Sequence, residues 1–195
     1  MNTYQKISKL SDELFRRKTG IKRKTFKRMV EILTEAELDK KKLGGKPNKL
    51  SIEERLLMWL EYVREYRTYF HTAASYGISE SACFRNCVWI ENTLIKAKES
   101  KILVQASTKI QGDTGYQGIQ KIRMNSDIPY RRKRNAELSK DNKKYNHLLS
   151  SKRIFVEHVI GRLKRFKVIS ERYRNRRHRF GLRFNLIAGV YNFEL

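Results

Sequence analysis

Apolar residues recur at steps of three and four along much of the chain, which is the spacing of one face of an α-helix. Residues 4–39 contain two such groups, separated by Gly20. After residue 50 a capping box, Ser51 with Glu54, begins another helical pattern, and two more follow it. The chain is therefore predicted to be mainly α-helical. The predicted helices after residue 50 are one from Ser51 through Val63, a short one from Thr68 to Tyr76, and one from Glu80 towards Lys96.

The turn between the last two of these helices has the composition of a helix-turn-helix. Ala73 lets two helices approach closely, Gly77 suits a left-handed turn, and Ile78 can enter the core. The following helix would then lie in the major groove of DNA, although the same spacing also occurs in purely structural hairpins. The predicted DNA-binding positions at its start are Ser79, Glu80, Ser81, Phe84 and Arg85.

Charge favours a polyanionic partner. Lys and Arg number 44 against 20 acids, a formal net charge of +24. Such an excess is not needed by an enzyme of small metabolites, and it attracts nucleic acid. No stretch approaches the ~20 apolar residues of a membrane-spanning helix, and the first residues lack the apolar run of a secretory signal. We therefore expect a cytoplasmic chain with no membrane partner.

A second candidate site lies in the C-terminal half. Lys101–Gln105 reads as a strand, and Asp113 follows in a glycine-punctuated turn, where α/β folds place catalytic groups. An Asx turn would equally explain this aspartate.

The segment from Ser150 to Lys167 predicts one helix with a broad apolar face, capped by Ser150 or Ser151. Beside that face Arg153, Glu157 and Lys164 share one stripe. A carboxylate between two cations favours its charged form and can bind a metal ion, whereas an exposed ion pair of this spacing adds only a few tenths of a kcal/mol. The apolar face comprises Phe155, Val156, Val159, Leu163 and Phe166.

Basic and polar segments separate these elements. Asp39–Asn48 reads as an exposed linker, and Pro129–Lys144 as a mobile arm that touches phosphate. Arg172–Phe180 alternates guanidinium with aromatic and polar groups, which suits phosphate contact and base stacking.

Cys83 and Cys87 are one helical turn apart. We interpret them as buried core residues rather than half of a zinc site with His71.

Together the motifs resemble those of bacterial insertion-sequence transposases of the DDE type. The resemblance lies in Asp113-Thr-Gly-Tyr-Gln-Gly118, in Arg153-x3-Glu157-x6-Lys164, and in the Arg-rich ending that leads to Leu186-Ile-Ala-Gly. It implies a helix-turn-helix followed by an RNase H-like domain, in which Asp, Asp and Glu hold two divalent ions, Mg²⁺ or Mn²⁺. Asp113 matches the second acid and Glu157 the third, so both are implied metal ligands. Arg153 and Lys164 match basic residues of the catalytic helix, whose usual tyrosine is replaced here by Ser150.

The first catalytic Asp of the family has no counterpart, since no Asp occurs between Asp39 and Asp113. The chain resembles an internally deleted copy, with a seam near Lys96–Lys98. We expect a fold that is mainly α, with a helix-turn-helix domain and an incomplete RNase H-like α/β domain. The expected boundaries are 1–49 for a helical lead-in and linker, 50–96 for the DNA-binding domain, and 101–195 for the truncated catalytic domain.

The resulting hypothesis is a catalytically defective DNA-binding relative of transposases that recognises double-stranded DNA at transposon ends. It would act as a homo-oligomer or in association with an intact transposase. A repressor-like DNA-binding module without any metal, and an RNA-binding basic protein, are the alternatives.

Overall fold

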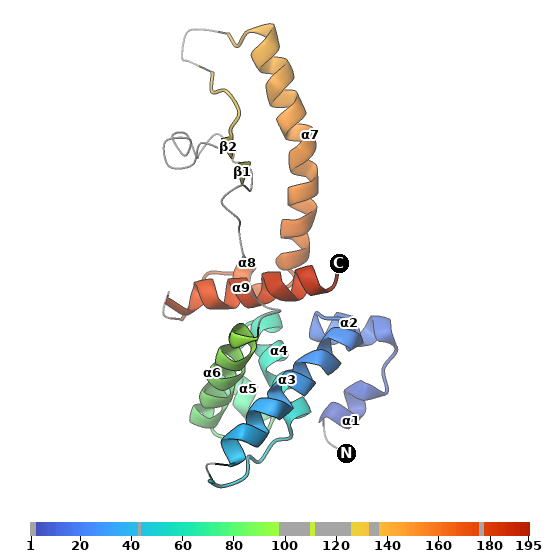
Figure 1. Ribbon diagram of the computed structural model, residues 1–195, viewed down its shortest axis with the longest axis vertical. Coiled ribbons are helices and arrows are strands. Elements are labelled where there is room, and N and C mark those ends of the chain that lie inside the picture. The colour runs from blue at the N-terminus through green and yellow to red at the C-terminus, as the bar shows by residue number, and fades with distance from the viewer. Residues whose placement is uncertain (1–2, 43, 98–109, 112–125, 133–136, 176–177) are drawn as a thin grey trace. The chain divides into compact units, whose positions relative to one another are not determined.

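The computed structural model describes residues 3–42, 44–97, 110–111, 126–132, 137–175 and 178–195. Within these ranges the chain is mainly helical, as the sequence predicts (Figure 1). It divides into two compact units, residues 1–102 with 163–195, and residues 103–162. The functional boundaries expected at residues 49, 96 and 101 stay predictions.

The first unit contains the following helices, in chain order: α1 Thr3–Ser8, α2 Asp12–Thr19, α3 Arg23–Lys41, α4 Ile52–Glu65, α5 Tyr69–Ser75, α6 Glu80–Lys96, α8 Lys167–Ser170 and α9 His178–Phe193. The predicted capping box is confirmed at the start of α4, where Ser51 accepts from the Glu54 amide and the Glu54 carboxylate accepts from Ser51. Gly20 ends α2 with a left-handed φ of 82°. The lead-in therefore has three helices rather than the two groups predicted, because α1 is a separate short helix.

The core of the first unit is built around α4. This helix packs against α3, α5, α6 and α8, and it buries residues on nearly all of its sides. A helix that is apolar around most of its circumference belongs inside a bundle. Its buried apolar residues are Leu56, Leu57, Met58, Trp59, Leu60, Tyr62 and Val63.

A buried ion pair connects α6 to α9. Glu91 is 0% and Arg183 1% exposed, and the Arg183 Nε donates to Glu91 Oε1 at 2.7 Å. Arg183 also donates to the hydroxyls of Tyr62, Tyr173 and Tyr69, at 3.1, 2.9 and 2.9 Å. Burial by itself lowers the pKa of Arg183, but Glu91 and the tyrosines more than offset this, so the pKa is raised.

A second ion-pair cluster holds the end of α9. The Glu194 carboxylate, almost fully buried, lies 3.3 Å from Arg165 and 3.5 Å from Arg16. It also accepts from the Thr25 hydroxyl at 3.1 Å and from the backbone N–H of Lys22. The C-terminal helix is thereby connected to α2 and to the start of α3.

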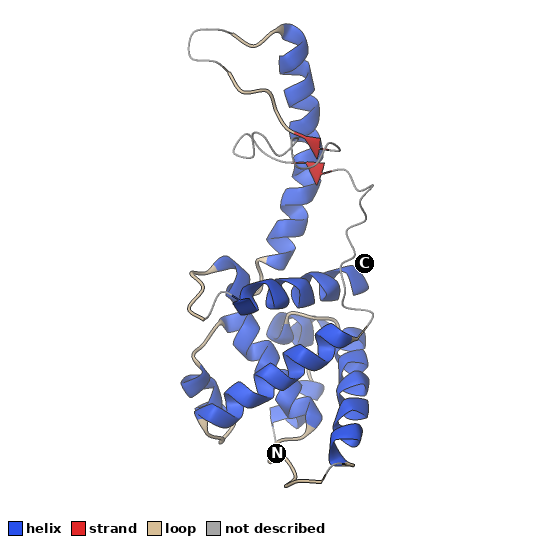
Figure 2. Ribbon diagram, turned by 60° about the vertical axis from the view of Figure 1, so that its left-hand side comes forward, coloured by secondary structure: helices blue, strands red, loops and turns tan. Residues whose placement is uncertain are grey.

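The second unit contains two short strands, β1 Ile110–Gln111 and β2 Ser126–Asp127, and all but the last residue of α7 Lys140–Leu163 (Figure 2). The strands pair in parallel, Ile110 opposite Ser126. The Asn146 side chain bonds both the N–H and the C=O of Tyr130, at 2.8 and 3.0 Å, so the residues after β2 are fixed to α7. No other strand occurs in the described ranges, and the strand predicted at Lys101–Gln105 lies outside them.

The helix predicted from Ser150 to Lys167 has different ends. It begins at Lys140, inside the segment predicted to be a mobile arm, and Ser139 rather than Ser150 or Ser151 accepts from the Asn142 amide. It ends at Leu163, because the next residues turn so that the buried Phe166 ring packs against Gly20. The predicted apolar face is largely solvent-facing at Phe155, which is 72% exposed, and at Val156. No helix in the described ranges is both long enough and apolar enough to cross a membrane.

The Glu91–Arg183 pair predicts a large stability effect. Glu91→Gln leaves a buried guanidinium without its counter-charge, so we expect the free energy of unfolding to fall by about 3–5 kcal/mol. The matched control is Glu31→Gln, which removes an exposed pair with Arg28 and should cost at most about 1 kcal/mol. Urea denaturation followed by circular dichroism measures both. Equal losses in the two variants would contradict a dominant role for the buried pair.

Candidate nucleic-acid interface

The predicted turn has a defined geometry. α5 begins after Thr68, whose hydroxyl accepts from the His71 amide at 3.2 Å. Past its end the Ile78 amide donates to the Ala73 carbonyl at 3.1 Å, and Gly77 has a φ of +61°. These features agree with the roles predicted for Ala73 and Gly77, since the small residue is buried and the glycine is left-handed, whereas Ile78 is only half-buried.

Ser79 caps α6 as predicted, with its hydroxyl accepting from the Ala82 amide at 3.3 Å. One side of the helix is buried against the rest of the unit, and Cys83, Cys87, Ile90 and Leu94 lie on it. The five predicted DNA-binding residues, Ser79, Glu80, Ser81, Phe84 and Arg85, are all exposed at the cap and in the first two turns of the helix. A capped helix start with polar, basic and aromatic side chains towards solvent is thus available to a duplex.

The exposed side is not freely mobile. Phe84, 46% exposed, packs edge-on against the Tyr69 ring with a centroid distance of 5.4 Å. Tyr69 in turn stacks on the buried Tyr62 at 4.5 Å. The orientation of α6 relative to α5 is therefore fixed by aromatic contacts as well as by the turn.

Part of the arginine-rich segment predicted to contact nucleic acid makes contacts inside the protein, whereas Arg172 is exposed, so nucleic-acid contact by this segment stays a prediction. Arg179 pairs with Glu91 at 2.7 Å beside Arg183. Arg174 lies over the Tyr66 ring and donates to the Tyr66 carbonyl, and Tyr173 stacks on the same ring. The sequence pattern does not reveal these contacts, because Glu91 lies 88 positions before Arg179 and Tyr66 lies 108 positions before Arg174.

The predicted catalytic residues are only partly described. Glu157 is exposed on α7, and Lys164 is exposed just beyond the end of that helix. Arg153 lies within α7, whereas Asp113 lies outside the described residues. The proximity of these four residues therefore stays a prediction.

The described residues do not form a metal centre by themselves. Among them, no three side chains of His, Cys, Asp or Glu are grouped as a metal ion requires. A divalent ion takes about six or more oxygen ligands, and the Glu157 carboxylate by itself provides at most two of them. Cys83 and Cys87 are buried free thiols, which confirms their interpretation as core residues.

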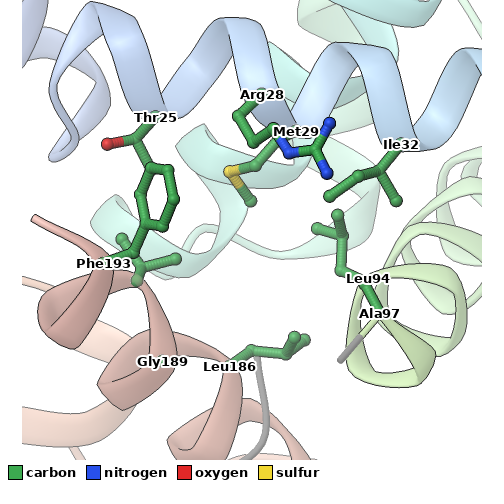
Figure 3. Close-up of a pocket in the computed structure, with 10 residues that line it drawn as sticks. Thr25, Arg28, Met29, Ile32, Leu94, Ala97, Leu186, Gly189 and Phe193 are labelled. Carbon is green, nitrogen blue, oxygen red and sulfur yellow. The ribbon is translucent and has the colours of Figure 1, made fainter. Parts of the chain in front are cut away.

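The apolar cavity of the first unit is not a candidate site for this chemistry. It has a volume of about 50 Å³ and lies where α3, α6 and α9 meet (Figure 3). Its walls are apolar side chains such as Met29, Leu94 and Leu186, with the Arg28 guanidinium and the Thr25 hydroxyl at the sides. Such walls accommodate an apolar side chain rather than a phosphate.

Comparisons with known proteins agree with the motifs. Residues 71–192 match the family described as DDE superfamily endonuclease. The chain is 33% identical to a probable transposase for insertion sequence element IS702 from Microchaete diplosiphon, in an alignment covering 98% of each chain. No solved structure matches this chain.

The length of that alignment reveals a large gap. It runs over 270 residues, whereas this chain has 195, so at least 75 aligned positions of the relative have no residue here. Since 98% of both chains is covered, missing ends do not account for a gap of this size, and the absent positions are mainly internal.

The turn before α6 makes a prediction about Gly77. A side chain in the left-handed conformation costs about 1–2 kcal/mol, so Gly77→Ala should lower the free energy of unfolding by that amount. The control is Gly181→Ala in α9, where an added Cβ meets no atom within 4 Å and helix propensity improves by up to about 1 kcal/mol. Thermal or urea denaturation distinguishes the two. A neutral Gly77→Ala would show that the turn relaxes without strain.

Proposed function

The chain belongs to the insertion-sequence transposases of the DDE superfamily, and on this premise we propose that it is a DNA-binding member that has lost strand cleavage and transfer. The observation that carries the DNA-binding part is the start of α6, where Ser79, Glu80, Ser81, Phe84 and Arg85 are exposed on a two-helix unit. In this proposal α5 and α6 are the helix-turn-helix, and α6 enters the major groove of double-stranded DNA.

Charge supports the same proposal. The chain carries +24 in total, and a cationic protein associates with duplex DNA through the phosphates before any base is read. Arg85 is the exposed cation on the early turns of α6, in a position from which an arginine can donate to guanine O6 and N7. Ser81 and Ser79 can donate to phosphate or to a base edge.

The loss of catalysis is inferred from the missing positions. Two-metal phosphoryl transfer needs several carboxylates, because two divalent ions roughly 4 Å apart repel each other and must be neutralised together. The family pattern provides three acids, of which this sequence retains Asp113 and Glu157. At least 75 positions are absent relative to the IS702 protein, and no Asp occurs between Asp39 and Asp113. The proposed seam near Lys96–Lys98 directly follows α6.

A DNA-binding copy without strand transfer would occupy transposon ends in the cytoplasm and compete there with an intact transposase, or associate with it. A repressor-like module is the second candidate, and it makes the same DNA contacts without ever needing a metal. RNA binding has less support, because the arginine–aromatic segment that favoured it is packed against Glu91 and Tyr66.

The proposed interface predicts an effect of Arg85→Ala. If Arg85 contacts a base, duplex binding should weaken by about 1–3 kcal/mol and become less sequence-selective. Arg17→Ala, an exposed arginine on α2, is the charge-matched control and should leave sequence selectivity unchanged. Fluorescence anisotropy with duplexes selected from a random pool measures both quantities. Equal behaviour of the two variants would place the DNA-binding surface elsewhere on the chain.

The proposed defect predicts no metal-dependent cleavage. Loss of one positioned metal ion removes several kcal/mol of transition-state stabilisation, and about 1.4 kcal/mol is already tenfold in rate. We expect nicking of supercoiled DNA in Mg²⁺ or Mn²⁺ to stay at background and to be the same for Glu157→Ala. Cleavage that disappears in both Asp113→Ala and Glu157→Ala would show a complete active site and overturn the proposed defect.

A further inference from the structure

The last two residues of α3 and the chain that follows them, residues 40–49, are strongly basic and contain no acid. Residues 40–49 read Lys-Lys-Lys-Leu-Gly-Gly-Lys-Pro-Asn-Lys, and we refer to them as the lysine arm. Lys40, Lys41 and Lys46 are exposed. Lys42 is exposed as well, but its ammonium pairs with Asp39 at 2.8 Å. The sequence alone indicates an ordinary linker at this place.

The structure shows that one end of the lysine arm is attached to the turn before α6. Lys49 Nζ donates to the Gly77 carbonyl at 2.7 Å. The Asn48 side-chain amide donates to Asn86 Oδ1 at 3.0 Å, and Asn86 is a buried residue of α6. Asn48 Oδ1 also accepts from the Leu50 amide at 3.2 Å, which fixes its rotamer.

The other end of the lysine arm is also held. It continues from α3, and α3 packs along α6. Gly44 and Gly45 then turn the chain with positive φ values of 82° and 111°, and the Gly44 amide donates to the Lys41 carbonyl at 2.9 Å. The loop after α3 and the start of α6 therefore lie at the same end of the unit (Figure 1).

These contacts hold the Asn48–Lys49 end of the lysine arm beside the turn that precedes α6. Asn86, which the lysine arm binds, directly follows Arg85 in α6, and Gly77 precedes the Ser79 cap by two residues. When a helix lies in the major groove, the chain segments that flank its start face the phosphates at the groove edge. Lysines held there lose less conformational freedom on binding than lysines of a loose linker.

We propose that the lysine arm is a second DNA-contacting element, in which Lys40, Lys41 and Lys46 bind backbone phosphates next to the groove entered by α6. This inference rests on the proposed function, because it extends the same interface. Asn48 is its positioning residue and acts by attaching the lysine arm to Asn86.

Salt dependence of duplex binding tests this proposal. Each phosphate contact contributes about 0.9 to the slope of log K against log salt concentration. The full-length triple variant Lys40→Ala, Lys41→Ala, Lys46→Ala should therefore reduce that slope by about 2 to 3. The control is Lys6→Ala, Lys9→Ala, Lys18→Ala, which removes the same charge from exposed positions of the N-terminal segment and should change the slope by less than about one.

A charge-neutral variant separates position from charge. Asn48→Ala keeps all lysines, detaches the lysine arm from Asn86, and should reduce the same slope while circular dichroism shows an unchanged helix content. Equal slopes for the two triple variants would overturn the role of the lysine arm and leave α6 as the interface. Absence of duplex binding by the unmodified chain would overturn the proposed function and the lysine arm with it.

Discussion

The buried pair of Glu91 with Arg183 is the interaction on which the first unit depends. A guanidinium and a carboxylate removed from water are tolerated only when each is paired and its remaining hydrogen-bonding groups are used. Here three tyrosine hydroxyls accept hydrogen bonds from Arg183, and the Arg179 guanidinium pairs with Glu91. The helices that contribute these groups, α4, α5, α6 and α9, are thereby held in one arrangement, because a shift of any of them would leave a buried charge unsatisfied.

The buried ion pairs also join the C-terminal residues of the chain to its N-terminal helices. Residues 163–195 are far from the first hundred residues in sequence, yet they complete the same core through Arg183 and Glu194. The proposed DNA-binding helices therefore do not need the catalytic sheet to form a closed hydrophobic unit. Their folding depends on α9 instead, which explains how a transposase relative with at least 75 positions missing retains a packed helical unit.

The proposed function has two parts, DNA binding and the loss of catalysis, and they rest on different structural observations. The α6 surface has a capped helix, a left-handed glycine and an aromatic contact that fix its geometry. The predicted catalytic residues have no comparable frame in the described part of the chain, where Glu157 is exposed on α7 and the apolar face beside it is exposed at Phe155. A DNA-binding surface requires one rigid element, whereas two-metal chemistry requires several acids from separate elements held within a fraction of an ångström.

Local signals were sufficient for the helices α4, α5 and α6 and for the turn before α6, but not for α1 or for the start of α7. The Ser51 capping box, the Ser79 cap and Gly77 act within four residues of themselves, and the motifs around Asp113 and Glu157 are contiguous enough to indicate the family. Only the tertiary structure decided what Arg183, Arg174 and Asn48 do. Each side chain could have faced solvent or a phosphate, and its partner, Glu91, Tyr66 or Asn86, lies between 38 and 108 positions away. Helix periodicity indicates which face of a segment is apolar, but it does not predict which distant residue the polar side chains of that segment will contact.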